Sequence, residues 1–273
     1  MITTYDFEQG TDEWLEMREG KLTASQFDVV LSSKTLKYAT ICKDPSDDDM
    51  AGMARAKKQS EVLMQLVLDG DVESKLLNAS GLKGLTDKGI VTIYDDSSGC
   101  TLLGSSTQKH IDNMLAEKYY KHGDLEPFHT SHAMERGNRL EPIARTDFEL
   151  LNDQKVDEVG FIINSEISKD VGCSPDGLIG DDGGIEIKCP LPSTHIAYHR
   201  DGILPTKYKA QVHGCMAVTG RKWWWFYSFC PGFKEFKLLV ERDAYTENLR
   251  RCLKEFDGIY QEQKTEIQQL ITD

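Results

Sequence analysis

Two carboxylates and an ammonium group lie close together in one short segment of the chain. Asp176 follows Pro175, and Glu186 and Lys188 come ten and twelve residues later, beyond a glycine-rich turn. Residues two apart in a strand point to the same face, so Glu186 and Lys188 share a face. A short hairpin would bring Asp176 beside them. Because carboxylate oxygens are preferred ligands of Mg²⁺, we predict a magnesium site here, with Mn²⁺ as the alternative ion.

The same side chains have a plainer interpretation, which is an exposed hairpin whose outer face carries a Glu–Lys ion pair. The E-x-K spacing alone has little specificity, and the upstream Pro175–Asp176 pair is what favours a site. Two carboxylates and an ammonium group taken out of water together cost desolvation energy unless a cation compensates. With a cation bound, Lys188 would orient or help deprotonate an attacking water and stabilise developing negative charge.

A second group of polar residues lies near the amino terminus. Thr23 and Gln26 have the spacing of a capping box, so a helix is predicted to begin here. Ser25 then falls in the first helical turn, where free N–H groups and the helix dipole favour an anion. The guanidinium group of Arg18 nearby offers paired, charge-assisted hydrogen bonds to a phosphate. Their plainer interpretations are a helix-start serine and a solvated charge at a helix end.

Helices are predicted to dominate the chain before residue 155. Thr11 caps a short helix that stops at Gly20, and the second short helix follows Thr23. Helical spacing recurs over residues 53–68 and 105–119. It recurs again over residues 132–150, where we expect the helix to be broken or entered near Pro142.

Strands become frequent after residue 155. Short β-prone segments are bounded by Gly, Asp and Pro, and the 181–184 segment carries a hairpin turn signal. The predicted strands cover 160–163, 177–180, 185–188, 223–229 and 235–240, and the predicted helices cover 208–218 and 243–270. This order predicts one α/β domain over residues 1–273, with a central mixed sheet flanked by helices. Residues 34–104 are predicted to form an elaboration on that domain.

Two other groups of residues have competing interpretations. Trp223, Trp224 and Trp225 are consecutive, and we favour a strand with buried aromatic side chains over a platform for base stacking. His195 and His199 have i, i+4 spacing, but no Cys or Glu completes a zinc set nearby. We therefore interpret these histidines as surface or channel residues.

Composition excludes several classes of protein. The chain has 273 residues, 39% hydrophobic and 28% charged, which rules out global disorder. Seven cysteines without a C-x-x-C pair argue against a disulfide framework or zinc ribbon and favour a reducing cytoplasm. We expect no membrane span and no secretory signal. The net charge of −13 argues against a general nucleic-acid coat protein but allows a DNA enzyme with a basic cleft.

Several motifs together resemble a known family. Pro175-Asp176, Glu186 and Lys188 match the PD-(D/E)xK nuclease signature. The narrower resemblance is to the phage lambda-type exonucleases, also described as YqaJ-like viral recombinases. It is carried by W-L-E-M-R-E-G-K-L-T-A-S at 14–25, G-N-R-L-E at 137–141, S-P-D-G at 174–177, E-I-K-C-P at 186–190 and A-Q-V at 210–212. The resemblance spans residues 11–33 and 130 to about 240, and residues 34–104 depart from it.

The resemblance implies a PD-(D/E)xK restriction-endonuclease-like core and a role for each matching residue. The metal site would comprise the acids Glu141, Asp176 and Glu186 with the Ile187 backbone carbonyl. Lys188 would be the catalytic lysine, and Gln211 would support the site or the nucleophilic water. A terminal 5′-phosphate would be held by Arg18, Ser25 and Ser174. The plainer interpretations are a first-turn acid for Glu141 and a polar helix position for Gln211.

The resemblance also implies an activity. The expected enzyme is a Mg²⁺-dependent exonuclease that digests linear double-stranded DNA from 5′ to 3′ and leaves 3′ single-stranded tails for recombination. Similar enzymes form a toroidal homotrimer around DNA and work beside a single-strand annealing protein in the cytoplasm. A PD-(D/E)xK endonuclease or RecB-like nuclease, an RNA-directed nuclease and a non-catalytic DNA-binding protein on the same fold are the alternatives.

Overall fold

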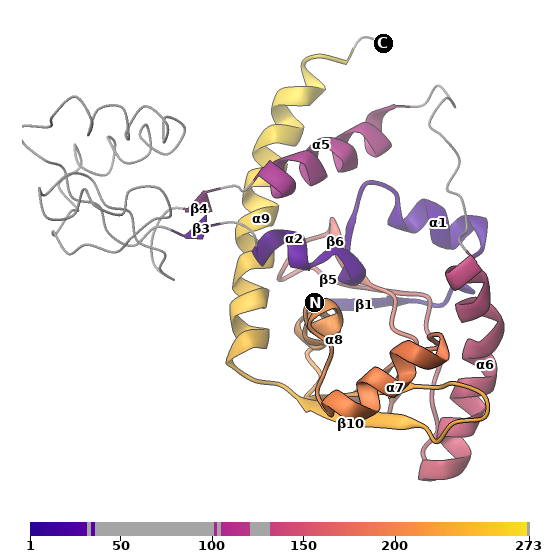
Figure 1. The fold of residues 1–273 in the computed structure, drawn as a ribbon. Coiled ribbons are helices and arrows are strands. Elements are labelled where there is room, and N and C mark those ends of the chain that lie inside the picture. Colours follow the sequence, from indigo (N-terminus) through magenta and orange to yellow (C-terminus); the bar gives the residue numbers. More distant parts are fainter. Residues whose placement is uncertain (32–33, 36–100, 103–104, 121–131, 272–273) are drawn as a thin grey trace, which may run out of the picture. The chain divides into compact units, whose positions relative to one another are not determined.

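The computed structural model describes residues 1–31, 34–35, 101–102, 105–120 and 132–271 (Figure 1). The chain divides into two compact units, Met1–Leu31 with Lys109–Asp273 and, separately, Ser32–Gln108. In the second unit, β3 (Lys34–Thr35) pairs antiparallel with β4 (Thr101–Leu102). The helix predicted over 53–68 lies outside the described residues. A single nuclease domain with an elaboration at 34–104 stays a prediction.

The first unit contains a four-stranded mixed sheet that the sequence patterns only partly predict. Its order is β1 (Ile2–Tyr5), β5 (Phe161–Asn164), β6 (Val171–Cys173) and β2 (Leu22–Thr23). β2 and β6 are parallel, with Thr23 opposite Gly172, and the other two pairs are antiparallel. This register brings the Thr23 end of β2 beside the Cys173 end of β6.

A second four-stranded sheet carries the predicted hairpin. Its order is β10 (Phe236–Glu241), β9 (Trp223–Ser228), β8 (Gly183–Lys188) and β7 (Gly177–Ile179). β7 and β8 form the antiparallel hairpin, whereas β8 and β9 are parallel. The mixed α/β prediction is confirmed, with the strands of this unit divided between two sheets.

The turn of the hairpin lies earlier than the turn signal indicated, because residues 180–182 connect the two strands and the predicted turn covered 181–184. Gly180, with φ at +52°, is in the turn, and Gly183 and Gly184 are in β8. A Cβ at Gly183 would lie 2.1 Å from the ring of Trp223, and one at Gly184 would lie 2.3 Å from that of Trp224. Only glycine lets the tryptophan rings approach the strand this closely. Trp224 is fully buried, which confirms the core interpretation of the aromatic strand.

Helices cover both sheets. The first unit and its entry contain α1 (Asp12–Arg18), a 3₁₀ turn (Ala24–Gln26), α2 (Asp28–Leu31), α5 (Ser105–Tyr119), α6 (His132–Asn152), α7 (Pro192–Asp201), α8 (Thr206–Thr219) and α9 (Ala244–Gln268). α8 contacts strands of both sheets, and α9 packs against it. Among the described residues, no helix combines the length and the apolar character that crossing a membrane needs.

The α6 helix runs through Pro142 instead of breaking there. A proline inside a helix costs about 3 kcal/mol because one backbone hydrogen bond is lost. Ala144 and Phe148, two and six residues beyond it, are fully buried against Ile185 and Ile187 of β8. This packing offsets the cost and fixes α6 across the second sheet.

The prediction for His195 is wrong. α7 was not predicted, and His195 within it is fully buried, not on the surface or in a channel. Its Nε2 lies 2.9 Å from the Lys234 carbonyl and its Nδ1 lies 2.8 Å from Ser228 Oγ. Because a carbonyl only accepts, Nε2 carries the proton and Nδ1 accepts from the serine. His195 is therefore a satisfied core residue, whereas His199 is exposed.

Candidate active site

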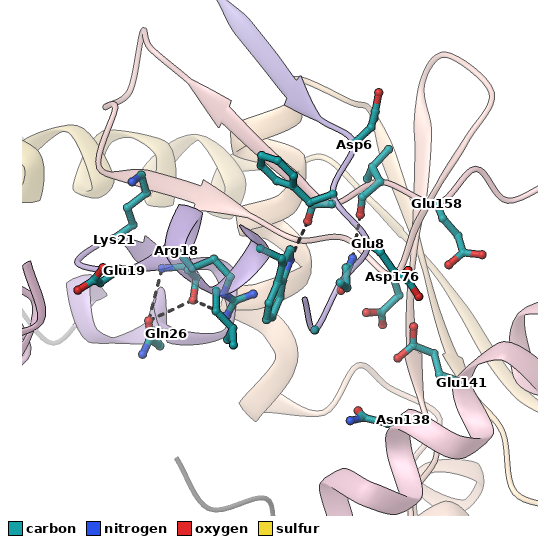
Figure 2. Close-up of a pocket in the computed structure, with 18 of the residues that line it drawn as sticks. Asp6, Glu8, Arg18, Glu19, Lys21, Gln26, Asn138, Glu141, Glu158 and Asp176 are labelled. Atoms are coloured by element: carbon teal, nitrogen blue, oxygen red, sulfur yellow. Dashed lines mark hydrogen bonds between the residues drawn. The ribbon is translucent and has the colours of Figure 1, made fainter. Parts of the chain in front are cut away.

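One cleft of about 1510 Å³ in the first unit is lined by members of both groups of predicted site residues, namely Arg18, Glu141 and Asp176. The predicted side chains that do not line it are those of Ser25, Ser174, Glu186, Lys188 and Gln211. Arg18, Lys21 and Gln26 lie toward one end, and Glu141, Glu158 and Asp176 lie toward the other (Figure 2). The first end is formed by α1 and the segment after it, and the second by α6 and the segment that leads into β7. Glu19 and Glu117 also line the cleft, and Glu19 lies beside Lys21 (Figure 2), so the Arg18 end carries charges of both signs whereas the other end is acidic.

Asp176 directly precedes β7 and is held by the neighbouring strand. Its Oδ2 accepts a hydrogen bond of 2.6 Å from the backbone N–H of Ile187 in β8. The N–H and C=O of one strand residue point to the same side, so the Ile187 carbonyl also points toward the Asp176 edge. Burial raises the pKa of Asp176, and the charge of Lys188 opposes that shift. The predicted carboxylate and backbone carbonyl therefore lie at one edge of the hairpin.

Glu186 and Lys188 point to the same face of β8, as the spacing predicts. Lys188 Nζ forms an ion pair with Glu186 Oε1, where the Glu186 side chain is 0% exposed and that of Lys188 is 25% exposed. Burial, followed by the charge of Asp176, raises the pKa of Glu186 to about 8. Burial lowers the pKa of Lys188, but the charges of Glu186 and Asp176 outweigh it and the net shift is upward. Lys188 is therefore a protonated ammonium group.

Glu141 lies within α6, so it is not the first-turn acid of the plainer interpretation. Its Oε1 accepts a hydrogen bond of 2.8 Å from Arg145 Nη2, one turn further along the helix. Burial and then the negative charge of Asp176 raise the pKa of Glu141 to about 7. Glu141, Asp176 and Glu186 thus belong to one electrostatic cluster, in which Lys188 and Arg145 supply only two positive charges against three carboxylates.

The donor chemistry of this cluster fits a hard divalent cation. Glu186 Oε2 is buried and has no hydrogen-bond partner among the described residues. A bound Mg²⁺ would supply the missing positive charge, and carboxylates with a backbone carbonyl are ligands that it prefers. As the described side chains stand, no three carboxylate, imidazole or thiol groups are placed to hold an ion between them. Mg²⁺ keeps several waters when bound, so fewer protein ligands suffice.

Arg18 and Ser174 meet at the other end of the cleft, which we call the Arg18 end. Arg18 Nη1 donates to Ser174 Oγ over 3.1 Å, and the guanidinium lies 4.0 Å from the centre of the Trp14 ring. Trp14 Nε1 donates to the same Ser174 Oγ over 3.0 Å. Burial lowers the pKa of Arg18 to about 10, so it stays charged at neutral pH. Arg18 makes no ion pair within the described part of the chain, which leaves its charge available for an anion.

Ser25 joins this group through Thr23. Thr23 Oγ1 lies 3.4 Å from Ser25 Oγ and accepts a hydrogen bond of 3.5 Å from Arg18 Nη2. The capping box between Thr23 and Gln26 forms as predicted. The helix that it starts is a 3₁₀ turn of only three residues, Ala24–Gln26, so the predicted helix dipole at Ser25 is small. The parallel register of β2 and β6 is what brings Ser25 toward Ser174.

Comparison with known protein families adds an independent finding. Residues 97–222 match the YqaJ-like viral recombinase domain. The matched range includes Glu141, Asp176, Glu186 and Lys188, whereas Arg18 and Ser25 precede it. The resemblance inferred from the sequence motifs is confirmed. No curated protein sequence matches the chain.

Solved structures match over most of the chain. An alkaline exonuclease from Laribacter hongkongensis, LHK-Exo, has 24% sequence identity and a TM-score of 0.57, covering 96% of this chain and 100% of that chain. The structure of LHK-Exo in complex with dAMP matches with 23% identity, the same TM-score of 0.57 and the same coverage of 96% and 100%. At this identity the likeness establishes a shared fold.

Gln211 lies in α8 within the YqaJ-like range, but nothing ties its side chain to the cluster. Its side chain has no hydrogen bond to another described residue. It lies one turn after Tyr208, whose ring centre is 5.2 Å from Lys188 Nζ, so both residues are on one side of the helix. A supporting role for Gln211 stays a prediction.

Motif reasoning missed two side chains that contact the acidic end. Gln9 Nε2 donates to the carbonyls of Val159 and Pro175 over 2.9 and 2.8 Å. Arg145 Nε donates to the Asp176 carbonyl over 3.3 Å. The i, i+4 spacing of Glu141 and Arg145 is a local signal that was available in the sequence. No local signal connects Gln9 to Pro175, because their contact depends on the tertiary fold.

Proposed function

We propose that this protein is a Mg²⁺-dependent exonuclease that digests linear double-stranded DNA from 5′ to 3′. The 3′ single-stranded tails that it leaves would serve recombination through a single-strand annealing protein in the cytoplasm. The supporting observation is one cleft that is lined by Arg18, which contacts Ser174, and by the carboxylates of Glu141 and Asp176. The likeness to an alkaline exonuclease, solved also in complex with dAMP, supports the same class of substrate.

Different residues of the site have different roles in the proposed phosphodiester hydrolysis. Arg18 and the hydroxyl groups of Ser25 and Ser174 would bind a terminal 5′-phosphate. When bound, Mg²⁺ supplies a Lewis acid that lowers the pKa of water and offsets phosphate charge. Glu141, Asp176, Glu186 and the Ile187 carbonyl would hold the ion, with Mn²⁺ as the alternative. Lys188, being protonated, would orient the attacking water and stabilise negative charge on the phosphate rather than act as a base.

End dependence separates this function from its nearest alternative. An exonuclease should degrade linear duplex DNA in Mg²⁺ and leave closed circular DNA of the same sequence intact. A PD-(D/E)xK endonuclease or RecB-like nuclease would linearise the circle. Cleavage of the circle at a rate comparable with the linear form would overturn the proposal. Absence of cleavage of either DNA would favour a non-catalytic DNA-binding protein, although the complete set of Asp176, Glu186 and Lys188 argues against that alternative.

The Arg18→Ala variant is expected to lose selectivity for phosphorylated ends. The wild type should prefer a 5′-phosphorylated duplex over a 5′-hydroxyl duplex. Removing the charge-assisted hydrogen bonds of Arg18 should cost about 1.5–3 kcal/mol, or roughly ten- to a hundredfold, on the phosphorylated substrate alone. Initial rates on the two duplexes, measured side by side, give the ratio.

The matched control for Arg18 is Arg200→Ala, which removes an exposed arginine from α7. Its ratio of rates on the two duplexes should equal that of the wild type. If Arg18→Ala slows both substrates equally and the preference survives, Arg18 is not the phosphate ligand.

The functional assembly is expected to be a closed ring, most simply a homotrimer around DNA. Closure requires contacts between different surfaces of neighbouring copies. A net charge of −13 suits an acidic exterior with a basic lumen, which keeps DNA inside the ring. Light scattering should give three times the mass of 30.8 kDa. A stable monomer at micromolar concentration that degrades long duplexes without dissociating would contradict the ring.

A further inference from the structure

Arg145 occupies the centre of the acidic end of the cleft. Its side chain is only 12% exposed and reaches three separate segments of the chain. Nη2 donates to Glu141 Oε1 over 2.8 Å, and Nη1 pairs with Glu158 Oε2 over 2.8 Å. Nε donates to the backbone carbonyl of Asp176 over 3.3 Å. One guanidinium thus connects α6, the segment before β5 and the start of β7.

Three hydrogen bonds hold Asp176 and the backbone around it in place. Gln9 Nε2 holds the carbonyl of Pro175, and Arg145 Nε holds the next carbonyl, that of Asp176. The Asp176 carboxylate itself accepts from the Ile187 N–H. Of these three partners, only Arg145 also holds a second acid of the cluster, Glu141.

We propose that Arg145 is a positioning residue that holds Glu141 and Asp176 at the separation from which both bind one divalent cation. This inference rests on the proposed function and adds a residue that the family motifs do not mark. Arg145 contacts Glu141, Glu158 and the Asp176 carbonyl, so its proposed effect on the cation is indirect. It acts on the acids through the planar geometry of its guanidinium, which a lysine cannot reproduce with a single ammonium group.

The Arg145→Lys variant tests this geometry alone, because the positive charge is kept and only the planar set of N–H donors is lost. Partners that orient metal ligands typically change metal affinity by about 10–100-fold when they are mutated. Calorimetric titration of the full chain with Mn²⁺, without DNA, should therefore show binding weakened about tenfold or more. In nuclease assays the Mg²⁺ concentration for half-maximal rate should rise by a similar factor, and saturating Mg²⁺ should restore most of the rate.

Arg221→Lys provides a matched control, because Arg221 contacts the same hairpin. Arg221 Nη1 donates to the carbonyls of Ile179, Gly180 and Gly183 at the turn between β7 and β8, far along the strands from the acids. This variant also removes guanidinium hydrogen bonds to backbone carbonyls of the hairpin while keeping the positive charge. It is expected to lower the melting temperature while leaving the affinity for Mn²⁺ within about twofold of the wild type, since it orients no metal ligand.

The outcomes separate the inference from the proposed function. Weaker Mn²⁺ binding in Arg145→Lys alone supports the positioning role. An affinity within twofold of the wild type, or an equal loss in Arg221→Lys, overturns it while leaving the exonuclease proposal intact. A wild-type chain that binds no Mn²⁺ and degrades no DNA in Mg²⁺ overturns both.

Discussion

The Asp176→Asn variant is expected to lose nearly all DNA cleavage in Mg²⁺ while keeping the wild-type fold. The amide oxygen of asparagine can still accept the 2.6 Å hydrogen bond from the Ile187 N–H, so the hairpin should be preserved. The negative charge that would hold the cation is lost, however. A bound metal contributes several kcal/mol to the transition state, so the rate should fall about a thousandfold. Single-turnover digestion of a 5′-phosphorylated duplex measures this loss.

The control for Asp176→Asn is Asp181→Asn, which changes an exposed aspartate in the turn of the same hairpin. It should digest DNA at the wild-type rate. Binding of DNA ends should persist in Asp176→Asn, because less negative charge then faces the phosphate. Glu186→Gln should lose cleavage in the same way. Cleavage by Asp176→Asn near the wild-type rate would rule out the carboxylate metal site.

The Lys188→Ala variant should fail in a different way. The acids remain, so calorimetry should still detect binding of Mg²⁺ or Mn²⁺. The attacking water and the phosphate lose a fixed positive charge, and removal of one such donor typically costs about 10²–10³ in rate. The substitution also leaves Glu186 buried without its ion-pair partner, so the melting temperature in the absence of metal should drop.

Lys207→Ala is the matched control for Lys188. Lys207 Nζ lies 4.7 Å from the centre of the Tyr208 ring, which Lys188 also approaches, but Lys207 is exposed on α8. Its removal should leave both cleavage and cation binding unchanged. If Lys188→Ala loses cation binding together with activity, Lys188 is a structural residue and the assigned role is wrong.

Local patterns predicted the elements whose determinants lie close together in sequence. The β7–β8 hairpin, the Thr23–Gln26 capping box and the long α9 helix all depend on short-range turns, caps and periodicity. β1, β2 and β6 are only two to four residues long and are defined by pairing with distant partners. Such pairing leaves no periodic signal in the strands themselves, so these strands were missed.

The candidate site likewise divides into residues that sequence patterns identified and contacts that depend on the tertiary fold. The E-x-K alternation and the motifs placed Glu186, Lys188 and Asp176 together, and the structure brings Arg18 to Ser174 as the resemblance implies. The contacts of Arg145 with Glu158 and Asp176 depend on how α6 crosses the second sheet, which no local spacing reveals. The burial of His195 likewise depends on Ser228 and Lys234, both distant in sequence.

The direction of digestion tests the central claim most directly. A linear duplex with 5′-phosphates is labelled on one strand, at the 5′ end in one sample and at the 3′ end in another, and digested in Mg²⁺. The proposed function predicts that the 5′ label is released first as a mononucleotide, while the 3′ label stays in long single strands. Early release of the 3′ label as mononucleotides, or labelled fragments from internal cuts, would contradict it.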